Sequence, residues 1–310
     1  MKKDIPTLDA KDRKLLMELE RNARASVREI ARNIRASKEV TNYRLKRLID
    51  TGIVKGFFPV IDYFSIGLNS YKILFNLYNF DEVLLEKIMH DMKKVYGANY
   101  SILVQSIRDL EINLWIKHPM EFYDFYDAFL NSYSTHIQNK EFFLVTRIYY
   151  KTHEFMHGGN SNIMIGTSGH CAVDKTDMDI LDELSKNARM PTIEIAKRLK
   201  LSPNTVQYRI RQLLQNGVIK GFRPRLDVSL LGYDTYKVLI MLGNSSKRRQ
   251  LIQTLLTEPN VVKISKTIGN SDMEIKVNFT SLMDLENFLR KLRTRNHSIR
   301  NFEIIAVAQD

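Results

Sequence analysis

The stretch TNYRLKRLIDTGIVKGF, from Thr41 to Phe57, recurs with small changes as VQYRIRQLLQNGVIKGF, from Val206 to Phe222. Each version reads as a basic helix, a glycine and a short β-like tail. Adding 165 to any position from Leu8 to Lys72 gives its counterpart without a gap, and 24 of the 65 pairs are identical. The chain therefore contains a duplicated unit, and only two copies at so long a period argue against a solenoid.

Hydrophobic periodicity predicts three helices in each copy. The first runs from about Asp9 to Arg21, the second is short, and the third begins at Ser37 or Ser202 and ends at Gly52 or Gly217. Serine is a good helix N-cap, and glycine is common just past a helix C-terminus. The runs IVKGFFPVID and VIKGFRPRLD then alternate apolar and polar residues around a proline, which predicts an edge strand or a wing.

The third helix of each copy has an inward apolar stripe and an outward polar face. Amide side chains can pair with adenine and cationic side chains with guanine, so such a face suits the DNA major groove. We predict that base edges are read by Lys38, Asn42, Tyr43, Lys46, Asn204, Thr205, Gln207, Tyr208 and Arg211. Phosphate contacts are predicted for Ser37, Arg44, Lys55, Ser202, Arg209 and Lys220.

The net charge of +12 lies in the two repeated segments. Residues Lys2 to Lys55 carry 15 Lys and Arg against 8 Asp and Glu, and Asp174 to Arg225 carry 11 against 6. Elsewhere the two signs balance at 21 each. Positive charge concentrated in two matched blocks indicates a polyanionic partner, most simply double-stranded DNA.

Each basic block is followed by a strand, helix, strand, strand, helix, strand pattern, first from Tyr71 to Tyr150 and then to the C-terminus. Such a βαββαβ unit packs both helices on one face of an antiparallel sheet. The other face needs a cover, and we expect another copy of the same sheet, from this chain or from a second one. The predicted fold class is α+β, with ferredoxin-like sheet domains.

These features resemble the leucine-responsive regulatory protein (Lrp/AsnC) family. The second copy matches the family's helix-turn-helix ending closely, with Ser202, Pro203, Thr205, Val206, Arg209, Ile210, Leu213, Gly217, Val218 and Ile219 on the pattern. The resemblance implies a homodimer or higher homo-oligomer formed through the sheet domains, and an amino-acid-like effector. It places the effector at a G-x-x-D turn formed by Gly269, Asn270, Ser271 and Asp272. The first copy, QSIRDLEI, keeps Asp109 but has no glycine there.

The predicted domains are a winged helix-turn-helix at 1–62, a sheet domain at 66–151, a linker at 152–172, a second winged helix-turn-helix at 173–227 and a second sheet domain at 231–310. We predict a cytoplasmic, sequence-specific transcription regulator. The two helices differ at outward positions, since Glu39 aligns with Asn204 and Lys38 with Pro203. We therefore expect an asymmetric operator, or one specific and one nonspecific domain. The opening residues MKKDIPTLDAKDRK lack the apolar core of a signal peptide and no 18-residue uncharged apolar run occurs, so we expect a soluble protein inside the cell. The single Cys171 excludes a disulfide within one chain.

Parts of the sequence also suggest three other functions. An architectural, weakly specific DNA-binding protein would discriminate little between sequences, and a siroheme-decarboxylase-like enzyme could share this architecture. A zinc protease is disfavoured because the H-E-x-x-H motif from His153 to His157 is cut off by Gly158 and Gly159. A structural metal bound by His153, His157, His170 and Cys171 stays open. We predict no catalytic residue, metal site, cofactor or membrane partner.

Overall fold

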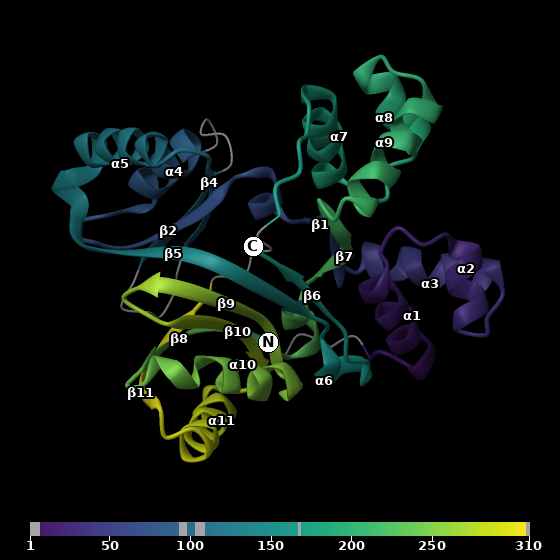
Figure 1. The fold of residues 1–310 in the computed structure, drawn as a ribbon. Coiled ribbons are helices and arrows are strands. Elements are labelled where there is room, and N and C mark those ends of the chain that lie inside the picture. The colour runs from purple at the N-terminus through teal and green to yellow at the C-terminus, as the bar shows by residue number, and fades with distance from the viewer. Residues whose placement is uncertain (1–6, 93–97, 103–108, 167–168, 308–310) are drawn as a thin grey trace. The chain divides into compact units, whose positions relative to one another are not determined.

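The computed structural model describes residues 7–92, 98–102, 109–166 and 169–307. Two compact units make up the chain (Figure 1). Unit 1 combines Met1–Ile66 with Tyr150–Asp234, and unit 2 combines Gly67–Tyr149 with Thr235–Asp310. Both helix-turn-helix segments thus belong to one unit, and both sheet domains belong to the other.

Unit 1 contains three helices from each copy, as the periodicity predicts. They are α1 (Ala10–Arg21), α2 (Val27–Asn33) and α3 (Lys38–Asp50), then α7 (Lys175–Lys186), α8 (Thr192–Leu199) and α9 (Pro203–Gln215). Asp9 and Asp174 cap α1 and α7 in reciprocal capping boxes with Asp12 and Asp177. These boxes satisfy backbone N–H groups that the first helical turn leaves free.

The strands after the third helices pair with each other. In β1 (Val54–Ile61) and β7 (Ile219–Leu226), Phe57 lies opposite Pro224 and Pro59 lies opposite Phe222, in an antiparallel two-stranded sheet. Because each strand lends its backbone to the other copy, the predicted edge strands are not independent wings. They join the two helix-turn-helix domains within one chain.

The stretch 152–172, predicted to be a linker, is partly folded. It contains the short helix α6 (Glu154–His157) and strand β6 (Asn162–Ile165). Met156 is 4% exposed and packs into the core of the first helix-turn-helix with Leu15, Leu16 and Leu19. The stretch is therefore not the flexible linker that its Gly, Ser and Asn content predicts.

Unit 2 contains both βαββαβ sets. The first is β2 (Asn69–Leu77), α4 (Glu82–Met92), β3 (Ala98–Ile102), β4 (Leu110–Ile116), α5 (Pro119–Tyr133) and β5 (Ile137–Lys151). The second is β8 (Asp234–Leu242), α10 (Arg248–Thr257), β9 (Val261–Gly269), β10 (Met273–Phe279), α11 (Leu282–Arg295) and β11 (Ile299–Ala306). The strands follow one another in the order β11-β8-β10-β9-β5-β2-β4-β3. Of the first-copy segment QSIRDLEI, residues 105–108 lie outside the described residues.

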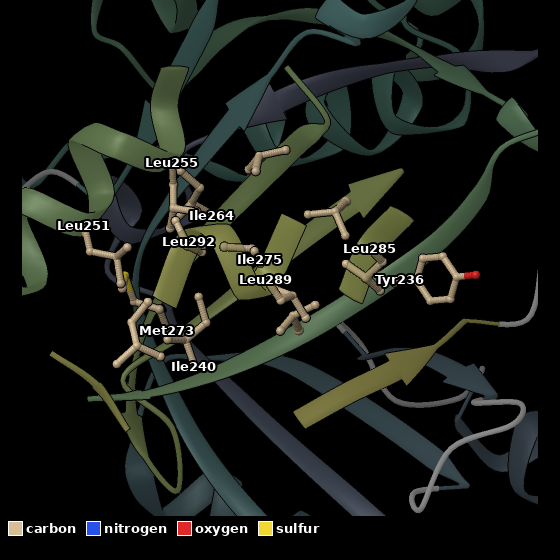
Figure 2. Packing of buried hydrophobic residues seen from close by; sticks show 14 of the residues in the cluster. Tyr236, Ile240, Leu251, Leu255, Ile264, Met273, Ile275, Leu285, Leu289 and Leu292 are labelled. Carbon is tan, nitrogen blue, oxygen red and sulfur yellow. The ribbon is translucent and has the colours of Figure 1, made fainter. Parts of the chain in front are cut away.

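Each half-sheet carries its helices on one face. Figure 2 shows the core of the second half, where Leu251 and Leu255 of α10 and Leu289 of α11 meet strand residues such as Ile264 and Ile275. The first half has its own core beneath α4 and α5. No helix among the described residues is long and apolar enough to cross a membrane.

The helix-free faces of the two half-sheets cover each other. Leu74 of β2, Phe143 of β5, Leu239 of β8 and Ile305 of β11 form one buried cluster. Because β5, β9 and β10 separate β2 from β8 in the strand order, this contact requires the sheet to curl until its halves face each other. The cover for each sheet is therefore the other sheet of the same chain.

Candidate nucleic-acid interface

The third helices of the two copies, α3 and α9, are built alike. Ser37 and Ser202 cap them, their Oγ atoms accepting hydrogen bonds from Val40 N at 3.2 Å and Thr205 N at 3.0 Å. The inward stripes are buried and consist of Thr41, Leu45 and Leu48 in α3 and Val206, Ile210 and Leu213 in α9. Burial of one stripe fixes the opposite face of each helix toward solvent.

The predicted base-reading side chains lie on that outer face. Those that are exposed are Lys38, Asn42, Tyr43, Lys46, Asn204, Gln207, Tyr208 and Arg211. Thr205 is half-buried, and its hydroxyl lies 2.8 Å from the Ser202 hydroxyl. Tyr43 and Tyr208 are 68% and 58% exposed, which leaves their rings and hydroxyl groups accessible to a partner.

Arg44 lies against the acidic start of α1 and serves the domain's own structure. Its Nη1 is 2.6 Å from Asp9 Oδ2 and 2.9 Å from Asp12 Oδ1. A hydrogen bond from the Asp12 backbone, together with Arg44, lowers the pKa of Asp9 to about 2. At 2.7 and 3.2 Å, the second copy repeats these contacts with Arg209, Asp174 and Asp177. Phosphate contact by these arginines stays a prediction.

The two predicted phosphate lysines form ion pairs that cross between the copies. Lys55 Nζ is 3.0 Å from Asp227 Oδ2, and Lys220 Nζ is 3.9 Å from Asp62 Oδ2. Positions 55 and 220, like 62 and 227, differ by the repeat offset of 165. The ion pairs are therefore reciprocal, as in a two-fold dimer, although a single chain supplies both halves.

A second set of reciprocal contacts comes from the shared N-A-R triplets at Asn22 and Asn187. Ala23 N donates to Phe222 O at 3.0 Å, and Ala188 N donates to Phe57 O at 2.9 Å. These bonds fasten the first helix of each copy to the strand of the other copy. Sequence identity at the triplets was visible, but it did not reveal their role.

The arginines of the two triplets, Arg24 and Arg189, also connect the two copies. Arg24 donates to the backbone carbonyls of Ala188 and Met190, and Arg189 donates to those of Ala23 and Ala25. Their guanidinium groups lie over the rings of Phe222 and Phe57, at 5.8 and 5.4 Å. Burial lowers the pKa of each arginine, and for Arg24 the charge of Arg189 adds to the effect.

Replacing Arg24 by Ala should lower the free energy of unfolding of unit 1 by about 1–2 kcal/mol, because the carbonyls of Ala188 and Met190 lose their donor. Chemical denaturation of the full chain measures the effect. Arg21, exposed at the end of α1, provides the control, and Arg21→Ala should change stability by less than about 0.5 kcal/mol. Equal losses in the two variants would contradict the assigned role of Arg24.

The H-E-x-x-H segment packs against a buried carboxylate on α1. Glu20 Oε1 is 2.6 Å from His153 Nδ1, and Glu20 Oε2 accepts from His153 N at 2.9 Å and bonds to His157 Nε2. Burial opposes ionisation of Glu20, but the charge of His153 and the bonds from both histidines outweigh it, so the pKa of Glu20 lies well below its usual value. Within the described ranges, no group of three or more His, Cys, Asp or Glu side chains is arranged to hold a metal ion.

The predicted effector turn is held by structural contacts. Gly269 has φ +134°, and a Cβ there would overlap the carbonyl oxygen of Phe142 on β5. Asp272 accepts from Leu242 N at 2.8 Å and forms an ion pair with Arg248. Asn270 is exposed. Effector binding at this turn stays a prediction, and packing alone accounts for Gly269 and Asp272.

Comparison with known proteins agrees with this geometry. A family model described as winged helix-turn-helix DNA-binding matches residues 8–55 and 173–220. The HTH-type transcriptional regulator FL11 of Pyrococcus furiosus is 30% identical over 117 residues, which cover 38% of this chain and 78% of the relative. The regulatory protein AsnC of Haemophilus influenzae is 33% identical over 118 residues, covering 38% of this chain and 79% of AsnC.

The fold of the whole chain also has a solved counterpart. The crystal structure of the siroheme decarboxylase NirDL superposes with a TM-score of 0.64 over 96% of this chain and 91% of that one, at 11% identity. Identity so low shows a shared fold and carries no activity with it. Taken with the repeated DNA-binding match and the similar regulators, the tandem helix-turn-helix and sheet domains make this chain a member of the Lrp/AsnC family.

Proposed function

We propose that this chain is a sequence-specific DNA-binding transcription regulator that presents two unequal recognition helices from one polypeptide. The reciprocal contacts between the two copies in unit 1 support the proposal. It pairs β1 with β7 and fastens each first helix to the other copy, so one chain supplies what two chains supply in a dimer. Both outer helix faces offer amide, hydroxyl and cationic groups, which suit base edges.

The two faces differ in the residues that would meet DNA. Matching positions carry Asn42 and Gln207, and Lys46 and Arg211, while Lys38 and Glu39 align with Pro203 and Asn204. Helices with different hydrogen-bonding groups favour different base pairs. The proposed operator therefore has two unlike half-sites, whereas an architectural protein would bind most sequences equally at a fixed salt concentration.

In vitro selection of bound DNA tests this proposal, with Asn42→Ala and Gln207→Ala as a matched pair of variants. Each substitution should relax the sequence preference at one half-site only, costing about 1–3 kcal/mol of discrimination there. Perfectly palindromic selected sites, or a loss shared equally by both half-sites, would count against unequal readers. Binding should also weaken steeply as salt rises, because phosphate contacts release counterions.

Two further predictions rest on the family resemblance. An amino-acid-like effector would act at the turn that contains Asn270. Assembly into homo-oligomers would use the sheet domains, but their helix-free faces already cover each other within the chain. Contacts with further copies are therefore left to sheet edges and to the outer helix layers.

A further inference from the structure

The helix pair of the first half-sheet is acidic. Together α4 and α5 carry six acidic residues and one cation, Lys87. We call this surface the acidic layer. Most of its carboxylates are exposed, and the acidic residues are Glu82, Glu86, Asp91, Glu121, Asp124 and Asp127. Exposed apolar side chains lie among them, namely Val83, Met120 and Tyr123.

The corresponding helices of the second half-sheet are basic. Together α10 and α11 carry six cations and two acidic residues, Asp284 and Glu286. We call this surface the basic layer. Its cations are Arg248, Arg249, Arg290, Lys291, Arg293 and Arg295, and Lys247 and Arg300 flank the two helices. Leu282 and Met283 are the exposed apolar residues of this layer.

Several of these charges have no bonding partner within the chain. In the part of the chain that the structure describes, no hydrogen bond or ion pair engages the carboxylates of Glu86 and Asp124 or the cationic groups of Arg249, Arg290 and Lys291. By contrast, Arg248 is paired with Asp272, and the Asp91 carboxylate accepts a hydrogen bond from Tyr133. The unengaged charges can therefore meet a partner without breaking internal contacts.

The two layers occupy equivalent places in their half-sheets and lie on opposite outer sides of unit 2. Because they come from a duplication, α4 and α5 occupy the same places in their half-sheet as α10 and α11 do in theirs. In Figure 1 the acidic layer lies on one outer side of unit 2 and the basic layer on the other, with the strands between them. One chain cannot bring its own two layers together in this arrangement.

We propose that the acidic layer of one chain docks on the basic layer of a second copy of the same chain. In this contact the carboxylates meet Arg and Lys side chains, and Val83, Met120 and Tyr123 meet Leu282 and Met283, so charge and apolar area are both complementary. The contact joins two different surfaces, so it is heterologous and adds copies head to tail. It does not depend on the proposed reading of DNA.

Nucleic acid is the other polyanion that the basic layer could bind. A nucleic-acid surface would account for α10 and α11, but it leaves the acidic layer and its exposed apolar side chains unexplained. A second copy accounts for both layers with one contact. Exposed charges are screened within about 10 Å at 0.1 M salt, so the assembly should weaken as salt rises.

A charge-swap experiment on the full chain tests the contact. The first triple variant reverses the acidic layer with Glu86→Lys, Asp124→Lys and Asp127→Lys. The second reverses the basic layer with Arg249→Glu, Arg290→Glu and Lys291→Glu. Light scattering after size exclusion, at about 20 mM salt, measures the mass. We expect wild type to exceed its 36.2 kDa monomer mass, each variant alone to stay monomeric, and an equimolar mixture of the two to assemble again.

In each variant both layers carry the same sign of charge, so copies of one variant repel each other. The two variants carry opposite signs, so they attract each other in the mixture. Circular dichroism of each variant checks folding. A matched control is Glu286→Lys, which makes the basic layer more positive and should tighten assembly at least twofold. Monomeric wild type at about 100 µM, unchanged assembly in either triple variant, or a mixture that stays monomeric would overturn the proposal. So would weaker DNA binding by the second variant without a change in mass.

Discussion

Glu111→Gln is expected to lower the free energy of unfolding by about 3–5 kcal/mol. Glu111 lies on β4, between the two half-sheets, and is 2% exposed. Its Oε1 is 2.8 Å from Lys237 Nζ, and its Oε2 is 3.5 Å from Lys72 Nζ. Glutamine keeps the shape but removes the charge, so two buried lysines lose a carboxylate.

The size of the effect follows from the balance of charge around Glu111. Lys72 also pairs with Glu274, so the two lysines and two glutamates alternate across the joint between the half-sheets. Burial lowers the pKa of Lys276 to about 8, and the charges of Lys237 and Lys263 add to this. Lys72, Lys237, Lys263 and Lys276 interact electrostatically around Glu111, so removing its carboxylate leaves an excess of buried positive charge.

The effect of Glu111→Gln should depend on pH in a defined direction. Burial opposes ionisation of Glu111, but Lys237 and Lys72 outweigh it, so its pKa in the folded chain lies below the ordinary value of 4.5. The carboxylate therefore stabilises the fold above about pH 4.5, and this contribution is lost as pH falls through the folded pKa. Wild type and variant should accordingly become more alike in acid.

Urea denaturation at several pH values measures the stability lost in Glu111→Gln and how that loss depends on pH. Glu121→Gln is a suitable control, because Glu121 is exposed on α5, and it should change stability by less than about 0.5 kcal/mol. A loss below about 1 kcal/mol for Glu111→Gln at neutral pH, or a difference that grows in acid, would show that the lysines do not need this carboxylate.

Gly269→Ala is expected to cost about 2–4 kcal/mol. Two independent features disfavour alanine. The backbone has φ +134°, a conformation that side chains other than glycine rarely adopt, and a Cβ would overlap Phe142 O and lie 3.2 Å from Phe142 C. The β5 backbone cannot withdraw easily, because it pairs with β2 from Ile137 to Val145.

Gly243 provides a matched control in the same unit. A Cβ there would meet its nearest atom at 3.8 Å, and the backbone is outside the left-handed region. Gly243→Ala should therefore lie within about 0.5 kcal/mol of wild type. Thermal unfolding of both variants decides the matter, since similar midpoints for the two would mean that β5 and β9 can separate locally without cost.

Local structure in this chain could be predicted from short-range chemistry. Ser37 and Ser202 start their helices, and Asp9 and Asp174 act as N-caps, because a capping side chain needs only the backbone two or three residues ahead. The order of strands and helices in unit 2 also followed from periodicity. Such signals depend on nearby residues, which one sequence displays.

Long-range pairing could not be predicted in the same way. Nothing in the stretches 54–61 and 219–226 indicates that they pair with each other, since a strand's hydrogen bonds carry no label for the partner. Likewise, Glu20 and His157 are separated by more than one hundred positions, so their contact has no local signal. Met156 is buried, but the polar residues next to it in the sequence do not indicate a core position. The sequence does not show that Arg44 and Arg209 pair with carboxylates, because those carboxylates lie 35 positions earlier in the chain.

The pairing of β1 with β7 has a consequence for how this regulator can change. In a symmetric dimer, one substitution in a recognition helix alters both half-sites of the operator at once. Here α3 and α9 are encoded separately but held together by the pairing of β1 with β7. In the proposed mode of binding, a substitution in one helix would therefore leave the other helix and its half-site unchanged. The two half-sites could then diverge one base pair at a time.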